Sequence, residues 1–212
     1  MAVTDFAQLQ QIKARLKKGA NVDQKVAINY FLPEKGCIGL FTKVKDETYD
    51  TIVKNLVASS NSYQRAINKI GLDEDELKEI PPVTLYGYED TKDALTRTTR
   101  DGYFRSDRYA ITHVFFSATQ VYMYKLVLST TSNERKERTE EYFYKDITNF
   151  STSDETVETW EYKGCNPMPT KTSVNTQQFS LIVPGDKFSC FTTGDIEQQV
   201  RAMKGKLREK KM

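Results

Sequence analysis

The sequence predicts an α+β protein, with a helical region over residues 1–80 and an antiparallel β-barrel or sandwich over residues 81–212 that ends in a capping amphipathic helix. Apolar residues recur every three or four positions in the first part of the chain, as they do along one face of an amphipathic helix. From about residue 83 they come instead in short aromatic and β-branched runs, separated by turn residues at roughly ten-residue spacing. The final segment returns to the helical period. This order favours separate helical and β regions over alternating β and α units.

The helical region is expected to contain two main apolar stripes. The first covers residues 6–16 and predicts a helix that ends near Gly19. A clearer stripe begins at Tyr49 and is repeated after Asn61, with Gly71 well placed as a C-terminal cap. We expect these helices to form the first of two regions, and the sequence leaves open whether they pack on the β region or stand apart from it.

The β region is expected to consist of short strands that end in a helix. Asp195 is a plausible N-cap for this helix, and its apolar seam is placed to plug the open end of a barrel. The seam consists of Ile196, Val200, Met203 and Leu207. The expected strands cover residues 83–89, 109–117, 120–129, 139–147, 147–154, 155–163, 178–185 and 187–192.

Composition limits the classes of partner. With 212 residues, 38% of them hydrophobic, the chain can bury a sizeable core. Its 31 basic and 29 acidic residues nearly cancel, so no overall field draws it to nucleic acid or to an anionic membrane, and only local patches could do so. The sequence has no apolar run long enough for a transmembrane segment, and its amino terminus lacks a signal-peptide core. We therefore expect a cytoplasmic protein.

No metal or cofactor site is predicted. Cys37, Cys165 and Cys190 are odd in number and lack CxxC spacing, which favours reduced thiols over a disulfide framework or a zinc site. His113 is the only histidine, which excludes a histidine-rich metal site. The acidic run at residues 73–76 lacks the spacing and central glycine of a calcium loop, and we interpret it as the first turn of a short helix.

The β region resembles the pleckstrin-homology (PH) superfold, in its bacterial PH-like branch. About seven antiparallel strands followed by one amphipathic helix is the order of that superfold, and the resembling part runs from Tyr109 to Lys211. Its most similar pieces are a hairpin at residues 111–125, a tyrosine-rich entry at 140–151, and residues 179–192 joined to the helix. The resemblance implies a binding or scaffold module without chemistry of its own, which acts on a protein partner or by self-association.

Phosphoinositide binding is disfavoured by the same resemblance. PH domains that bind phosphoinositides place Lys and Arg in and beside the loop between their first two strands. In the predicted hairpin that loop is Ser117–Gln120, which contains no cation. Charge comes instead in the next turn, residues 133–138, where acids alternate with bases and weaken the net field.

Both faces of the predicted strand at residues 121–128 are apolar. Tyr122, Tyr124, Leu126 and Leu128 share one face, and only Lys125 interrupts the other. A small barrel covers one face with its own core and helix. The second face therefore requires cover from the N-terminal helices or from another subunit.

One polar segment, residues 97–108, is the best candidate interaction surface. Arginines are interspersed there with aromatic residues, a combination that suits nucleic acid. Asp101 and Asp107 offer the arginines local partners, which disfavours nucleic-acid binding and favours an ion-paired loop. The candidate interaction residues are Arg97, Arg100, Tyr103, Arg105 and Arg108.

Two other functions remain open alternatives, although we expect no catalytic residue. A nucleophile would need a base, which leaves His113 with Cys165 or Cys190, and any two of the 29 acids could also converge in an enzyme site between the two regions. The basic end of the C-terminal helix could bind a polyanion, although cations also complement a helix C-terminus. Its test residues are Lys206, Lys210 and Lys211.

Overall fold

The computed structural model describes residues 6–32, 34–35, 41–42, 44–72, 81–99, 101–161, 170–193 and 196–211. Helices and antiparallel sheets make up this part of the chain, so the predicted α+β class is confirmed. The expected short helix whose first turn is at residues 73–76, the cap Asp195 and the interaction residue Arg100 lie outside the described residues. The N-terminal elements are α1 (Phe6–Lys17), α2 (Val22–Phe31), β1 (Glu34–Lys35), β2 (Phe41–Thr42), α3 (Asp46–Ser59) and α4 (Ser62–Ile70).

The breaks between these helices follow local chemistry. Asn61 adopts a left-handed conformation, with φ of 50°, between α3 and α4, and Gly71 ends α4 with φ of 80°, so both predicted boundaries are confirmed. Helix α2 was not predicted from its apolar spacing. It begins with a capping box in which Gln24 N–H donates to Asn21 Oδ1 and Asn21 N–H donates to Gln24 Oε1, each at 2.9 Å.

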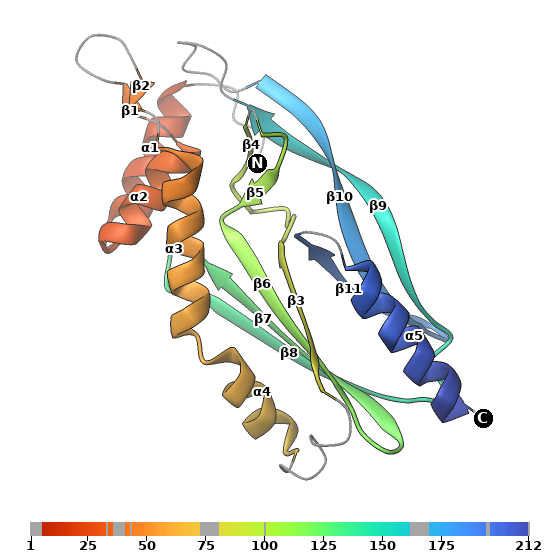
Figure 1. Ribbon diagram of the computed structural model, residues 1–212. Coiled ribbons are helices and arrows are strands. Elements are labelled where there is room, and N and C mark those ends of the chain that lie inside the picture. The colour runs from red at the N-terminus through yellow and green to blue at the C-terminus, as the bar shows by residue number, and fades with distance from the viewer. Residues whose placement is uncertain are drawn as a thin grey trace.

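The strands form a four-stranded and a three-stranded antiparallel sheet (Figure 1). The four-stranded sheet has the order β3-β6-β7-β8, and the three-stranded sheet has the order β11-β10-β9. A small two-stranded hairpin, β4 with β5, is inserted between β3 and β6. The strands are β3 (Val83–Tyr88), β4 (Thr96–Thr98), β5 (Phe104–Ser106), β6 (Arg108–Phe116), β7 (Gln120–Ser129), β8 (Arg135–Phe143), β9 (Asn149–Glu161), β10 (Thr170–Val183) and β11 (Asp186–Thr192).

The expectation of a closed barrel is corrected by the strand pairing. Among the described residues, neither sheet closes on itself, although the two approach each other where β3 meets β11. Thr193 N–H donates to Tyr86 O at 2.7 Å. Gly87 permits this approach, because a Cβ at that position would lie 1.9 Å from the carbonyl oxygen of Phe191.

The two sheets and the C-terminal helix α5 (Glu197–Lys211) enclose one core. The predicted apolar seam of α5 is buried, which confirms that the helix packs on the sheets. Lys125 lies on the inner face of β7, where its Nζ donates to Glu89 Oε2 at 2.9 Å and to Ser189 O at 3.1 Å. Core residues include Val114, Phe116, Val121, Met123, Phe150, Phe179, Leu181, Phe188, Val200 and Met203.

The N-terminal helices cover the other face of the four-stranded sheet. Figure 1 shows α3 and α4 along this side and α5 on the opposite side of the molecule. Tyr124, Leu126 and Leu128 of β7 form one cluster with Ala66 of α4 and with Leu72. The second apolar face is thus covered by helices of the same chain, which is one of the two alternatives that the sequence left open.

Candidate interaction site

The segment singled out in the sequence becomes the β4–β5 hairpin and the start of β6. Arg97 lies in β4, Arg105 in β5 and Arg108 at the first position of β6. Gly102, with φ of 77°, makes the hairpin turn and is followed by Tyr103. The hairpin packs between α3 and the β9–β10 pair, so its side chains meet partners distant in sequence.

Arg105 is buried and engaged within the chain. Its Nε lies 2.9 Å from Asp50 Oδ1 and its Nη2 lies 3.0 Å from Asp50 Oδ2, so the pair is bidentate. The same Nη2 lies 2.8 Å from Asp101 Oδ2. Burial tends to raise the pKa of Asp101, but the hydrogen bonds from Arg105, Tyr103 N–H and Thr99 outweigh it and leave that pKa below its ordinary value. Arg105 therefore fixes the hairpin to α3.

Arg97 is buried as well, against the aromatic residues of α2 and α3. Its guanidinium lies over the ring of Tyr30, 4.5 Å from the centroid, and Nη1 donates to the Tyr30 carbonyl. The Tyr30 ring stacks on Tyr49 at 4.3 Å, and Tyr49 Oη donates to Ser106 O at 2.7 Å. Burial raises the pKa values of both tyrosines, so both rings stay neutral.

Arg108 is half-buried at the sheet end of the segment. Its Nη1 lies 2.8 Å from Glu134 Oε2, and its Nε lies 3.9 Å from Asp107 Oδ1. Asp107 is buried and accepts hydrogen bonds from Leu95 N–H at 2.9 Å and Thr131 Oγ1 at 2.7 Å. Burial raises the pKa of Asp107. Arg97 and Arg105 are thus buried, because residues distant in the sequence hold them in the interior: the carboxylate of Asp50 holds Arg105, and the ring and carbonyl of Tyr30 hold Arg97.

Tyr103 remains exposed, with 61% of its surface accessible, and it lines two adjoining hollows. The first hollow, of about 310 Å³, lies against α3, and the second, of about 260 Å³, lies against β10. Tyr88, Tyr103 and Thr193 line both, so we call the two hollows together the Tyr103 groove. The first is also lined by Asp50, Val53, Lys54, Arg105 and Tyr109, and the second by Gly102, Phe104, Asn175, Thr176, Gln177 and Thr192.

The chemistry of the Tyr103 groove suits recognition. Its α3 side contains the Arg105–Asp50 pair, to which Tyr88 Oη adds a hydrogen bond at 3.3 Å, and the exposed Lys54. Burial raises the pKa values of Tyr88 and Tyr109, so their hydroxyls stay protonated. Its β10 side has no charged side chain among the described lining residues. Aromatic, amide and hydroxyl groups together provide stacking surface and neutral hydrogen bonds.

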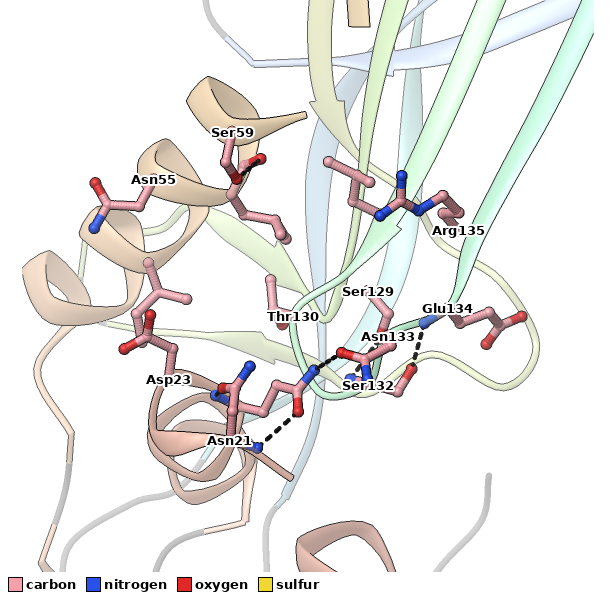
Figure 2. A pocket seen from close by; sticks show the side chains of 14 residues that line it. Asn21, Asp23, Asn55, Ser59, Ser129, Thr130, Ser132, Asn133, Glu134 and Arg135 are labelled. Atoms are coloured by element: carbon pink, nitrogen blue, oxygen red, sulfur yellow. Dashed lines mark hydrogen bonds between the residues drawn. The ribbon is translucent and has the colours of Figure 1, made fainter. Parts of the chain in front are cut away.

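A further pocket, of about 450 Å³, lies between α2, α3 and the β7–β8 turn, and Figure 2 shows its lining. Gln24 Nε2 donates to Asn133 Oδ1 at 2.7 Å and so connects the start of α2 to the turn. Two carboxylates line the pocket among the described residues. Glu134 pairs with Arg108 and Lys136, and Asp23 lies in the first turn of α2. The described lining contains no histidine or cysteine. The serine and threonine hydroxyls of its described lining make no hydrogen bond to the carboxylate of Asp23 or of Glu134.

His113 lies on the face of β6 that the helices cover. Its Nδ1 lies 2.9 Å from Thr84 Oγ1 and its Nε2 lies 3.0 Å from Ser62 Oγ, so it joins α4 to β3. Burial lowers the pKa of His113 to about 4, and burial raises the pKa of the Cys190 thiol to about 12. Cys190 belongs to the core on the opposite face of the sheet, so the two cannot form a dyad. Cys165 lies outside the described residues.

The basic residues of α5 are partly paired with acids of the same helix. Lys206 Nζ lies 3.0 Å from Glu209 Oε2, and Arg201 Nη2 lies 3.3 Å from Glu197 Oε2. These pairs are exposed, so they lower the local positive charge without fixing the side chains firmly.

No family model, no curated protein and no solved structure matches the chain. Within the part of the chain that the structure describes, no helix is both long enough and apolar enough to cross a membrane. Sequence reasoning located Tyr103 but missed Tyr88, Asn175 and Thr193, which join it only through strand pairing.

Proposed function

We propose that the protein is a non-enzymatic binding module of the PH-like type, which acts through protein–protein interaction with the Tyr103 groove as its contact surface. One observation carries the proposal: an exposed tyrosine, Tyr103, stands between two hollows lined by aromatic, amide and hydroxyl groups. Exposed aromatic residues beside neutral polar groups are typical of protein contact surfaces, where a few such residues supply most of the affinity.

The order of the elements supports the PH-like assignment. A four-stranded antiparallel sheet, a three-stranded antiparallel sheet and a C-terminal helix follow one another along the chain and share one core. In this assignment the first strand is β3, so residues 89–107 join the first two strands in place of the Ser117–Gln120 turn. The described arginines in that connection, Arg97 and Arg105, are engaged within the chain, so phosphoinositide binding is disfavoured on this different ground.

A protein partner is favoured over a polyanion or a small substrate. Nucleic acid and anionic lipid require free cations, and the two described arginines of the β4–β5 hairpin, Arg97 and Arg105, are buried. An enzyme site between helices and sheet is less well supported, because the pocket in Figure 2 brings no base to a nucleophile among its described lining residues. Self-association through the same groove is the form of protein interaction that an experiment must separate from binding to another protein.

Site-specific photo-crosslinking tests the proposal. Tyr103 is replaced by benzoylphenylalanine in the full chain, within the cells that naturally express it, and the matched control carries the same residue at Tyr86. Tyr86 is also exposed, at 42%, but it lies outside the lining of the groove. We expect one defined protein adduct at Tyr103 and none at Tyr86. An adduct of twice the chain mass identifies self-association, and equal labelling at both positions contradicts the proposal.

A further inference from the structure

The edge of β10 extends past the strand that pairs with it. On one side β10 pairs with β9 from Thr170 to Ile182, along nearly its whole length. On the other side it pairs with β11 only from Gln177 to Val183. No described strand pairs with the β11 side of β10 at residues 170–176. Half of this edge therefore lies beyond the end of β11.

The hydrogen bonds of β10 show which residues face the unpaired side. Thr192 Oγ1, at the end of β11, donates to Gln177 O, so the backbone of Gln177 faces β11. Thr148 N–H donates to Ile182 O at 2.7 Å, so even-numbered residues face β9. Both backbone groups of a residue point to the same edge in an antiparallel strand. The N–H and C=O groups of Lys171, Ser173 and Asn175 thus face the open side, and we call them the open β10 edge.

The Tyr103 groove adjoins the open β10 edge. Its second hollow is lined by Asn175 and Gln177 of β10, by the end of β11 at Thr192, and by Tyr103 of the hairpin. The hollow thus lies beside the position that a continuation of β11 would occupy. The hollow measures about 260 Å³ and is lined by β10, the end of β11 and the β4–β5 hairpin, so it suits a side chain of one extended segment better than the edge of a whole sheet. A second copy of this chain, which would bring a sheet edge from among its described strands, is therefore disfavoured as the occupant.

We infer that the open β10 edge binds one extended peptide segment of a partner protein, which pairs with Lys171, Ser173 and Asn175 in line with β11. This inference rests on the proposed function and names its partner. Main-chain hydrogen bonds supply the affinity in such strand addition, and hollows beside the edge select alternate side chains. The second hollow has no charged residue in its described lining, so the peptide residue that enters it is uncharged. Tyr103 packs against that side chain.

Amide exchange of the free protein tests the premise. In NMR exchange measurements on the full chain, the N–H groups of Lys171, Ser173 and Asn175 exchange at least tenfold faster than those of Thr172 and Val174, which face β9. Equal protection along residues 171–175 means that the edge is already paired, and it overturns the inference before any ligand is added.

Binding is tested with a displayed library of linear 12-residue random peptides, selected against the full-length protein and measured by fluorescence anisotropy. The variant Ser173→Pro removes the N–H that faces the edge without touching the pairs with β9, and Ser173→Ala is the matched control that keeps it. We expect Ser173→Pro to weaken the selected peptide at least tenfold and Ser173→Ala to change its affinity less than twofold. If Ser173→Pro fails to fold, N-methylation at alternate peptide positions applies the same test to the wild-type protein.

The outcomes separate this inference from the proposed function. Protection of the Lys171, Ser173 and Asn175 amides by the peptide, together with the loss in Ser173→Pro, supports strand addition. Peptides that bind without protecting these amides, or a library that yields none, overturn it, while crosslinking at Tyr103 judges protein binding independently. A dimer of this chain in which the same amides become protected replaces the peptide with a second copy and also overturns the inference.

Discussion

Lys69 of α4 donates to Glu137 of β8, with 2.7 Å between Nζ and Oε2, and so joins the last N-terminal helix to the edge of the sheet. Arg65, one turn earlier, donates to Oε1 of the same carboxylate. The side chain of Glu137 is only 13% exposed, whereas those of Arg65 and Lys69 are 39% and 46% exposed. One shielded carboxylate thus anchors two solvated cations of α4.

We expect Glu137→Gln to lower the free energy of unfolding by about 1 kcal/mol at pH 7, since solvent screens the two cations. Hydrogen bonds from Lys69 and Arg65 hold the pKa of Glu137 below its ordinary value of 4.5 despite partial burial. The stabilisation is therefore present above pH 4.5 and is lost as the pH falls through the lower folded value. Urea unfolding at several pH values measures it, with the exposed Glu141→Gln as control. Equal effects of the two variants would contradict the anchor.

Replacement by alanine is expected to change the stability in opposite directions at two glycines. A Cβ at Gly87 would overlap the backbone of Phe191, so Gly87→Ala must push β3 away from β11 and should cost about 2–4 kcal/mol of stability. Gly205 lies within α5 with open space around its Cα, so Gly205→Ala should stabilise by about 0.5–1 kcal/mol. Thermal and urea unfolding of both variants check this pair. A neutral Gly87→Ala would mean that β3 and β11 do not need their close approach.

The sequence predicts the parts of the fold that depend on local chemistry. The seam of α5, the break at Asn61 and the cap at Gly71 are all confirmed, because each follows from spacing or backbone conformation within one turn. Helix α2 was missed because buried residues occupy more than one face of it, although its Asn21 and Gln24 capping box was visible. Closure of the barrel was wrong because sheet edges depend on long-range pairing.

The candidate site also combines features that one segment of sequence reveals with features that depend on distant residues. Alternating aromatic and basic residues predicted an interaction surface at residues 97–108, and Tyr103 is exposed there. The burial of Arg105 could not be predicted, because its main partner Asp50 lies 55 positions away. The same is true of Arg97, which meets the carbonyl of Tyr30 from 67 positions away. Spacing within a segment cannot reveal partners that only the packing of α2 and α3 supplies.

The single histidine gives a clean pH prediction. Burial lowers the pKa of His113 to about 4 from 6.5, so the folded state favours the neutral ring. The contribution of the neutral ring to the free energy of unfolding is therefore complete above pH 6.5. It declines by roughly 2–3 kcal/mol in all as the pH falls from 6.5 toward 4. Urea unfolding of wild type and His113→Gln across this range should show a steeper loss of stability in wild type, because the variant keeps only the slope from the carboxyl groups. An imidazole NMR signal that titrates near pH 6.5 in the folded protein would overturn the prediction.

The bidentate pair between Arg105 and Asp50 should not tolerate a lysine. Arg105→Lys keeps the charge but cannot donate to both Asp50 oxygens and to Asp101, so we expect a loss of about 2 kcal/mol in the free energy of unfolding. The exposed Arg208→Lys in α5 is the matched control and should change stability by less than about 0.5 kcal/mol. A double-mutant cycle with Asp50→Asn should give a coupling energy of about 1–3 kcal/mol.

Because Arg105 also forms a wall of the Tyr103 groove, Arg105→Lys should reduce crosslinking at Tyr103 as well. Coupling indistinguishable from zero would show that the hairpin is held to α3 by its apolar contacts alone.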